Sequence, residues 1–211
     1  MRTARLLAVL GTLIASAASA EGPVPASFTV ISPIFGQLVR FSMPSSFVAV
    51  GENTRGGHYF REAVPKGESA ERWSQMITVT GAKGLAGNPD ISPQAFAGSM
   101  VGGFKTACPD SFAAKALGPT RFGDHEAFVA VTGCGRIDGS ADRHGETALI
   151  IAVKGNADYY TVQWAERTSG TARPAVEDAK WAERLRQLQP IRLCAIQPGE
   201  AAPYPSCVGK N

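Results

Sequence analysis

Three histidines are the residues of this chain best suited to acid–base or metal chemistry: His58, His125 and His144. Two of them stand beside carboxylates, in the segments Asp124-His125-Glu126 and Asp142-Arg143-His144. Imidazole nitrogens and carboxylate oxygens together form a ligand set that zinc and other transition metals accept. A metal site is therefore the first hypothesis, and the elements around the two segments decide whether it can form.

The strands expected around these histidines argue against a shared site. Residues 125–134 are apolar on both sides over their middle, and 147–153 is a similar run, so both are predicted to be central strands. His125 begins the first strand and His144 precedes the second. In an antiparallel hairpin the two starts are separated by roughly 30 Å, at about 3.3 Å per residue. We therefore predict no metal site, and a surface position for His58.

Other signatures of catalysis are missing from the sequence. It contains no GxSxG, HExxH, Walker or GxGxxG motif. A serine or cysteine nucleophile needs a base and an orienting group within hydrogen-bond reach, and no such set stands out. We predict no catalytic residue and no cofactor; a hydrolase site assembled from distant strands is the alternative.

The four cysteines, Cys108, Cys134, Cys194 and Cys207, have a spacing typical of structural disulfides. An even count in an exported protein indicates two bridges, and no CxxC spacing suggests a metal or redox site. Four cysteines allow three connectivities, of which sequence proximity favours Cys108–Cys134 and Cys194–Cys207. Each bridge would stabilise the fold by roughly 3 kcal/mol on the chain-entropy argument.

The first 20 residues have the pattern of a secretory signal peptide. Arg2 and Arg5 precede an apolar run from Leu6 to Ala17, and Ala18-Ser19-Ala20 is a small-residue cleavage pattern. The apolar run is shorter than the about 20 residues that a membrane span needs. We therefore predict a soluble mature protein, residues 21–211, in the periplasm or outside the cell, with no stable membrane anchor.

The charge of the chain disfavours nucleic acid as a partner. Removal of Arg2 and Arg5 lowers the formal net charge from +3 to about +1, and the remaining charges are mixed, with no basic run. Nucleic-acid binding depends on clustered Lys and Arg. We expect an unknown envelope protein or a small ligand instead.

The mature chain is predicted to hold a single α+β domain over residues 37–194, because strands and two helices share one core. An extended segment, 21–36, leads into it, and a Pro-rich tail, 195–211, is held by the second disulfide. One helix starts at Ser92-Pro93 and ends at Cys108, and the other spans Ala175–Leu188. Gly102 and Gly103 are expected to let the first helix lie close to the sheet. The predicted strands of a mostly antiparallel sheet are 38–43, 47–52, 58–64, 76–80, 112–117, 125–134, 147–153 and 159–165.

The phrase YFREAVPKGESAERWSQMITVTG is predicted to form a corner between two strands. Pro65 ends the first strand because it lacks the ladder N–H, and Ser69 is predicted to cap a single helical turn, 70–73. Trp73 is expected to fold under the corner and to close one end of the core. Recognition of a partner through Arg72 and Trp73 is the alternative.

This order of elements resembles the PsbP/Mog1 family of α/β/α sandwiches. The resemblance is carried by Val39–Met43 followed by FVAV, by the junction VPKGESAERWSQMITV and by the closing helix with Trp181, and it extends over nearly the whole mature chain. Members of that family mostly act as binding or accessory domains. The resemblance therefore implies a non-catalytic domain of the bacterial cell envelope. Its expected binding surfaces are the corner at Arg72 and Trp73, and the groove between the sheet and the helix at 93–105.

Overall fold

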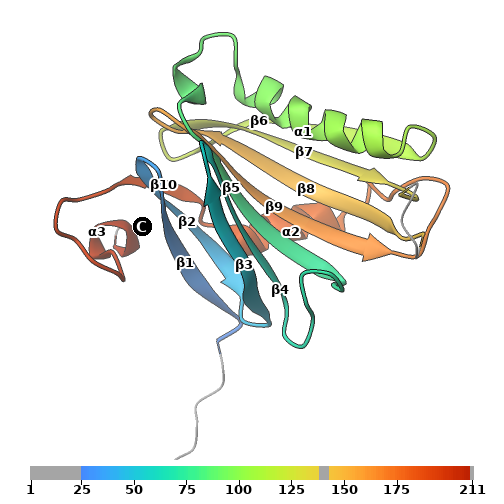
Figure 1. The fold of residues 1–211 in the computed structure, drawn as a ribbon, viewed down its shortest axis with the longest axis horizontal. Helices are drawn as coiled ribbons and strands as arrows, with labels where there is room; N and C mark the ends of the chain where they lie inside the picture. The colour runs from blue at the N-terminus through green and yellow to red at the C-terminus, as the bar shows by residue number, and fades with distance from the viewer. Residues whose placement is uncertain (1–24, 138–142, 210–211) are drawn as a thin grey trace, which may run out of the picture.

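The computed structural model describes residues 25–137 and 143–209 (Figure 1). The predicted signal peptide, 1–20, lies outside the described residues. The strands are β1 (Ser27–Ile34), β2 (Gln37–Pro44), β3 (Phe47–Arg55), β4 (His58–Pro65), β5 (Gln75–Ala82), β6 (Phe112–Phe122), β7 (His125–Cys134), β8 (Gly145–Lys154), β9 (Tyr159–Thr168) and β10 (Arg192–Ala195). The helices are η1 (Leu85–Gly87), α1 (Pro93–Ala107), α2 (Lys180–Leu188) and α3 (Pro205–Val208).

The strands form two antiparallel sheets. The large sheet has seven strands in the order β3-β4-β5-β9-β8-β7-β6, and the small sheet has three, β1-β2-β10. Helix α1 lies over the β6-β7-β8 half of the large sheet, while the small sheet and α2 lie against its opposite face (Figure 1). This arrangement belongs to the predicted α+β class.

The main core lies between the two sheets. Alternate residues of the large sheet, such as Ile77, Val162 and Trp164, face Val39 and Phe41 of β2. Helix α2 adds Trp181, Leu185 and Leu188 to the same core. A smaller cluster lies beneath α1, where strands that are apolar on both faces meet its apolar stripe. That cluster consists of Phe96, Ala97, Met100, Val101, Phe104, Phe128, Ala130, Ala148, Ile150, Ala152 and Ala165.

An ion-pair cluster attaches α2 to the large sheet. Glu166 of β9 is buried and lies 2.7 Å from the Lys180 ammonium and 2.8 Å from the Arg184 guanidinium. Arg184 also lies over the ring of Trp164, 4.5 Å from its centroid. Breaking one member of such a pair leaves a buried charge without compensation, so this cluster fixes where α2 sits.

All eight predicted strands are present, and the structure adds two that were not predicted. Strand β1 falls within the segment expected to be merely extended, where Pro33 is tolerated because β1 is an edge strand. Strand β10 has only four residues, between Pro190 and the tail. Both belong to the small sheet, so the segment 21–36 contributes a strand to the folded domain.

Three local predictions were wrong. No helical turn forms at 70–73, because the Glu68 carboxylate binds both the backbone N–H and the hydroxyl of Ser74 and draws the chain into an irregular bend. Helix α2 begins at Lys180 rather than Ala175, since the side chain of Asp178 accepts the Lys180 N–H. Gly102 and Gly103 are exposed on the solvent side of α1, with open space where a Cβ would lie, so they do not mediate contact with the sheet.

Candidate functional site

Helix α1 leaves half of one face of the large sheet uncovered. It contacts mainly β6, β7 and β8 and reaches β9 at Tyr159 and Ala165, whereas β4 and β5 continue the same face beyond it (Figure 1). The register places Phe60, Thr80 and Thr161 side by side across β4, β5 and β9. The next row of the same face holds Glu62, Thr78 and Gln163. Among the described residues, no other element covers this part of the face, so it is available to a ligand or partner.

A groove of about 610 Å³ lies between α1, the segment around η1 and the uncovered strands. Its volume is within the range of about 300–1,000 Å³ that small-molecule sites occupy. Aromatic and aliphatic side chains provide most of its surface, with a few hydroxyl groups among them. The lining residues are His58, Tyr59, Phe60, Thr80, Gly81, Ala82, Leu85, Ile91, Ala95, Phe96, Ser99 and Met100.

Tyr159 holds the end wall of the groove in place. Its ring stacks on Phe96 of α1 with a centroid separation of 4.6 Å, and its hydroxyl donates to the carbonyl of Ile91 at 2.5 Å. Burial raises the pKa of the Tyr159 phenol, with the charge of Glu126 adding to the effect. The phenol therefore stays protonated and keeps donating to the Ile91 carbonyl. Together with the stacking on Phe96, this bond fixes α1 and the segment before it relative to β9.

A buried carboxylate anchors the segment around η1 from behind. Asp158 accepts the backbone N–H of Gly84 through Oδ1 at 2.7 Å, and the N–H of Gly36 through Oδ2 at 3.2 Å. The Tyr160 hydroxyl lies 3.2 Å from the same Oδ2. Gly84 precedes Leu85, which lines the groove, so Asp158 ties this wall to the β1–β2 turn. Sequence reasoning did not single out Asp158.

Three polar side chains form a hydrogen-bonded row on the floor of the uncovered face. The Gln163 amide donates to Thr161 Oγ1 at 3.0 Å, and Thr161 Oγ1 lies 2.6 Å from Thr80 Oγ1. Thr161 is fully buried, whereas Thr80 reaches the groove. The row therefore ends in a hydroxyl that a bound molecule can touch.

The predicted corner at Arg72 and Trp73 forms a second, more polar cleft of about 490 Å³. Trp73 is half-buried and does not belong to the core, so the expectation that it closes the core was wrong. The guanidinium of Arg167 covers its ring at 3.9 Å and donates to the carbonyl of Glu71 at 3.1 Å. Arg72 is exposed beside it. One face of the tryptophan is thus already occupied by the protein itself.

The structure keeps the three histidines apart. In the β7–β8 ladder Ala127 pairs with Val153 and Cys134 with Glu146, so His125 and His144 lie toward opposite ends, as expected. His125 Nδ1 lies 3.0 Å from the carbonyl of Lys154. His58 is exposed at the mouth of the groove. Within 25–137 and 143–209, no group of three His, Cys, Asp or Glu side chains could hold a metal ion; Asp142 falls outside these ranges.

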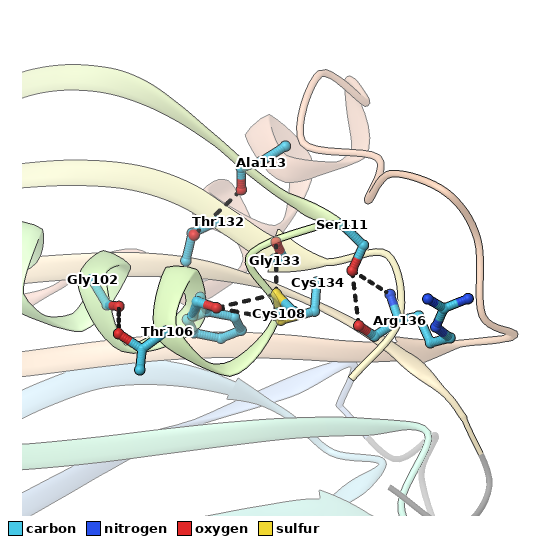
Figure 2. The surroundings of a disulfide bond; sticks show 10 residues. Gly102, Thr106, Cys108, Ser111, Ala113, Thr132, Gly133, Cys134 and Arg136 are labelled. Carbon is cyan, nitrogen blue, oxygen red and sulfur yellow. Dashed lines mark hydrogen bonds between the residues drawn. A yellow bond between two sulfur atoms is a disulfide. The ribbon is translucent and has the colours of Figure 1, made fainter. Parts of the chain in front are cut away.

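Both disulfides join segments that are close along the chain, with separations of 26 and 13 positions. Cys108, after α1, joins Cys134 at the end of β7, with Cα atoms 5.7 Å apart (Figure 2). The hydroxyl of Ser111 brackets the same corner, because it donates to the Arg136 carbonyl at 2.8 Å and accepts the Arg136 N–H at 3.1 Å. Cys194–Cys207 ties α3 to β10. These are the pairings that sequence proximity favours.

Comparison with solved structures finds distantly similar chains. No family model matches the chain, and no curated protein matches it. A crystal structure at 1.50 Å resolution of a chain from Bacteroides thetaiotaomicron is similar over 83% of this chain, with 14% sequence identity and a TM-score of 0.40. This chain spans about half of that one (51%). So low a similarity supports no argument about fold or function.

Among the described residues, the helices are all too short or too polar to cross a membrane.

Proposed function

We propose that the protein is an exported, non-catalytic binding or accessory domain of the bacterial cell envelope, and that its ligand occupies the groove between α1 and strands β4 and β5. The observation that supports this most directly is the groove itself, about 610 Å³ in volume and lined mainly by apolar side chains. Concave apolar sites with a few placed polar groups are where proteins usually bind small molecules.

The groove is a better candidate than the corner at Arg72 and Trp73. Arg167 covers one face of the Trp73 ring, and Ser69 and Glu68 are engaged in hydrogen bonds within the corner. A ligand there would displace interactions that already exist. In the groove, by contrast, Phe60 retains 39% of its surface exposed, so a ligand would remove apolar area from water.

An envelope hydrolase is the second candidate. The corner cleft gathers His144, Ser74 and Ser169, which are residue types that hydrolases use. The Ser74 hydroxyl, however, donates to Glu68 at 2.6 Å, so its hydrogen points to a carboxylate rather than to an imidazole. If the cleft is a hydrolase site, His144→Ala abolishes turnover of ester substrates by the protein; unchanged turnover excludes that role for His144.

The proposed location draws on the two disulfides. Bridges of this kind persist in oxidising spaces such as the periplasm and the exterior of the cell. The predicted signal sequence agrees with that location. A PsbP/Mog1-like role as an accessory domain is part of the same proposal, supported by the presence of a helix on each face of the large sheet.

Occupancy of the groove can be tested with a fluorescent apolar probe, N-phenylnaphthylamine. Ala95 is exposed on α1 and lines the groove, so Ala95→Trp should fill it without disturbing the core. Ala107 is exposed at the end of the same helix but does not line the groove, which makes Ala107→Trp the matched control. We expect wild type and Ala107→Trp to bind the probe and Ala95→Trp to lose binding at equal melting temperature. Equal binding by all three, or none by wild type, would contradict the proposal.

A further inference from the structure

We infer that the hydroxyl of Thr80 is a hydrogen-bond donor that the groove presents to its ligand, and that this ligand is an uncharged, mainly apolar molecule with a carbonyl-type acceptor. The inference rests on the proposed function, because it concerns the same groove. It adds the chemical class of the ligand and the residue that selects it.

The direction of the donor follows from the row of side chains behind it. Gln163 donates its amide hydrogen to Thr161 Oγ1, so that oxygen already acts as an acceptor. Thr161 is fully buried, and its own hydroxyl hydrogen needs an acceptor. Thr80 Oγ1, at 2.6 Å, is the hydroxyl within reach. Thr161 therefore donates to Thr80, and the hydrogen of Thr80 is left to point elsewhere.

The place to which that hydrogen can point is the groove. Thr80 lines it, and its strand neighbour Phe60 forms the adjoining wall. The other two hydroxyls on the lining already donate elsewhere: Ser99 to the carbonyl of Phe96 at 2.7 Å, and Tyr59 to the carboxylate of Glu52 at 2.9 Å. An acceptor atom of a ligand placed against Thr80 would receive the hydrogen bond of the Thr80 hydroxyl, the last donor in the row.

The lining also excludes a charged ligand. Within the described chain, none of its twelve side chains is a lysine, arginine, aspartate or glutamate. Below the exposed mouth, where His58 lies, a carboxylate or ammonium would lose water without gaining a partner of opposite charge, which is costly. The ligand chemistry that fits is thus an aromatic or aliphatic body with a ketone, ester or amide oxygen.

Two neutral naphthalene probes test whether the groove prefers a ligand with a carbonyl acceptor over one without. Prodan carries a ketone acceptor, whereas N-phenylnaphthylamine carries an N–H donor and no carbonyl. Thr80→Val removes the hydroxyl while keeping the shape of the side chain. Thr78→Val is the matched control, since Thr78 lies on the same strand and face but does not line the groove. Thr80→Ser retains the hydroxyl and serves as the rescue.

We expect Thr80→Val to raise the dissociation constant of prodan by about 2- to 12-fold, the range of one neutral hydrogen bond, and to leave N-phenylnaphthylamine unchanged. Thr78→Val and Thr80→Ser should bind prodan as wild type does. If Thr80→Val folds poorly because Thr161 loses its acceptor, the double variant Thr80→Val/Thr161→Val removes both hydroxyls together and should show the same selectivity.

The inference is overturned if the loss of the Thr80 hydroxyl weakens neither probe, both equally, or only N-phenylnaphthylamine; the last result would make Thr80 an acceptor. Its failure is distinguishable from failure of the proposed function. If N-phenylnaphthylamine binds wild type and Ala95→Trp blocks it, the groove is a binding site whatever Thr80 does.

Discussion

Asp158 is the buried carboxylate that holds the groove wall, and Asp158→Asn tests this role with almost no change of shape. The carboxylate accepts the N–H groups of Gly84 and Gly36, and it shares the Tyr160 hydroxyl with the carbonyl of Ile34, each at 3.2 Å from that hydroxyl. Asparagine replaces one oxygen with an NH₂ group. Whichever way the amide turns, at least one of the two backbone N–H groups then faces a donor and loses its acceptor.

The cost can be worked from these contacts. A buried donor left unsatisfied costs about 1–3 kcal/mol, and hydrogen bonds to a charged group contribute about 1.5–3 kcal/mol each. We expect Asp158→Asn to lower the free energy of unfolding by about 2–4 kcal/mol. For a domain of this size that corresponds to a fall in melting temperature of about 4–16 °C. Because Gly84 precedes Leu85 in the groove wall, the affinity for N-phenylnaphthylamine should fall as well.

Circular dichroism during thermal and urea unfolding measures the first effect, and probe fluorescence at a temperature where both proteins are folded measures the second. Asp178→Asn is the control: Asp178 is exposed and accepts one backbone N–H, from Lys180, which asparagine accepts equally well. We expect it to change stability by less than about 0.5 kcal/mol. If Asp158→Asn unfolds with the wild-type midpoint and binds the probe equally, Asp158 does not anchor the wall.

Three further predictions concern charge and covalent links. Burial raises the pKa of Glu146 against the opposing charges of Arg167 and His144, so the wild type should lose stability as the pH rises through that pKa. In urea titrations the stability of Glu146→Gln relative to wild type should therefore increase from pH 4 to pH 8. A stability difference that does not change with pH would refute this role of Glu146. Burial, followed by the hydrogen bond to Glu52, raises the pKa of Tyr59 to about 12, so the wild type should lose stability between about pH 10 and 12, and Tyr59→Phe should lose less over that range. Replacing both cysteines of the Cys108–Cys134 disulfide with serine removes the cross-link that restricts the unfolded chain. The free energy of unfolding should fall by about 3.5 kcal/mol, measured as a shift of the urea midpoint; an unchanged midpoint would contradict the entropic argument.

The covering of the large sheet by α1 could be predicted from the strands beneath it. Residues 125–134 and 147–153 are apolar at successive positions, which indicates strands buried on both faces, and they are β7 and β8 under the helix. The start of α1 was readable because Ser92 accepts the Ala95 N–H, as a capping serine does. The pattern of these two strands alone does not show where α1 stops covering the sheet.

The small sheet and the groove wall were harder to predict, because long-range contacts decide them. Strand β10 is formed by pairing with β2, more than 150 positions earlier in the chain, and its four residues carry no periodic signal of their own. Asp158 resembles any turn aspartate in the sequence. Its importance comes from Gly36 and Gly84, which lie 122 and 74 residues away.

The uncovered face did leave a signal in the sequence, in the alternation of β5 and β9. Ile77 and Val79 face the core while Thr78 and Thr80 face outward, and β9 alternates in the same way. A central strand that is polar at alternate positions predicts a face without a covering element, just as a strand that is apolar throughout predicts a covered one. Where the two kinds of strand meet, beside Phe96 of α1, apolar surface from the covered half borders hydroxyl groups from the open half. That boundary is why this groove suits a molecule with an apolar body and a single polar acceptor, rather than one that is apolar or polar throughout.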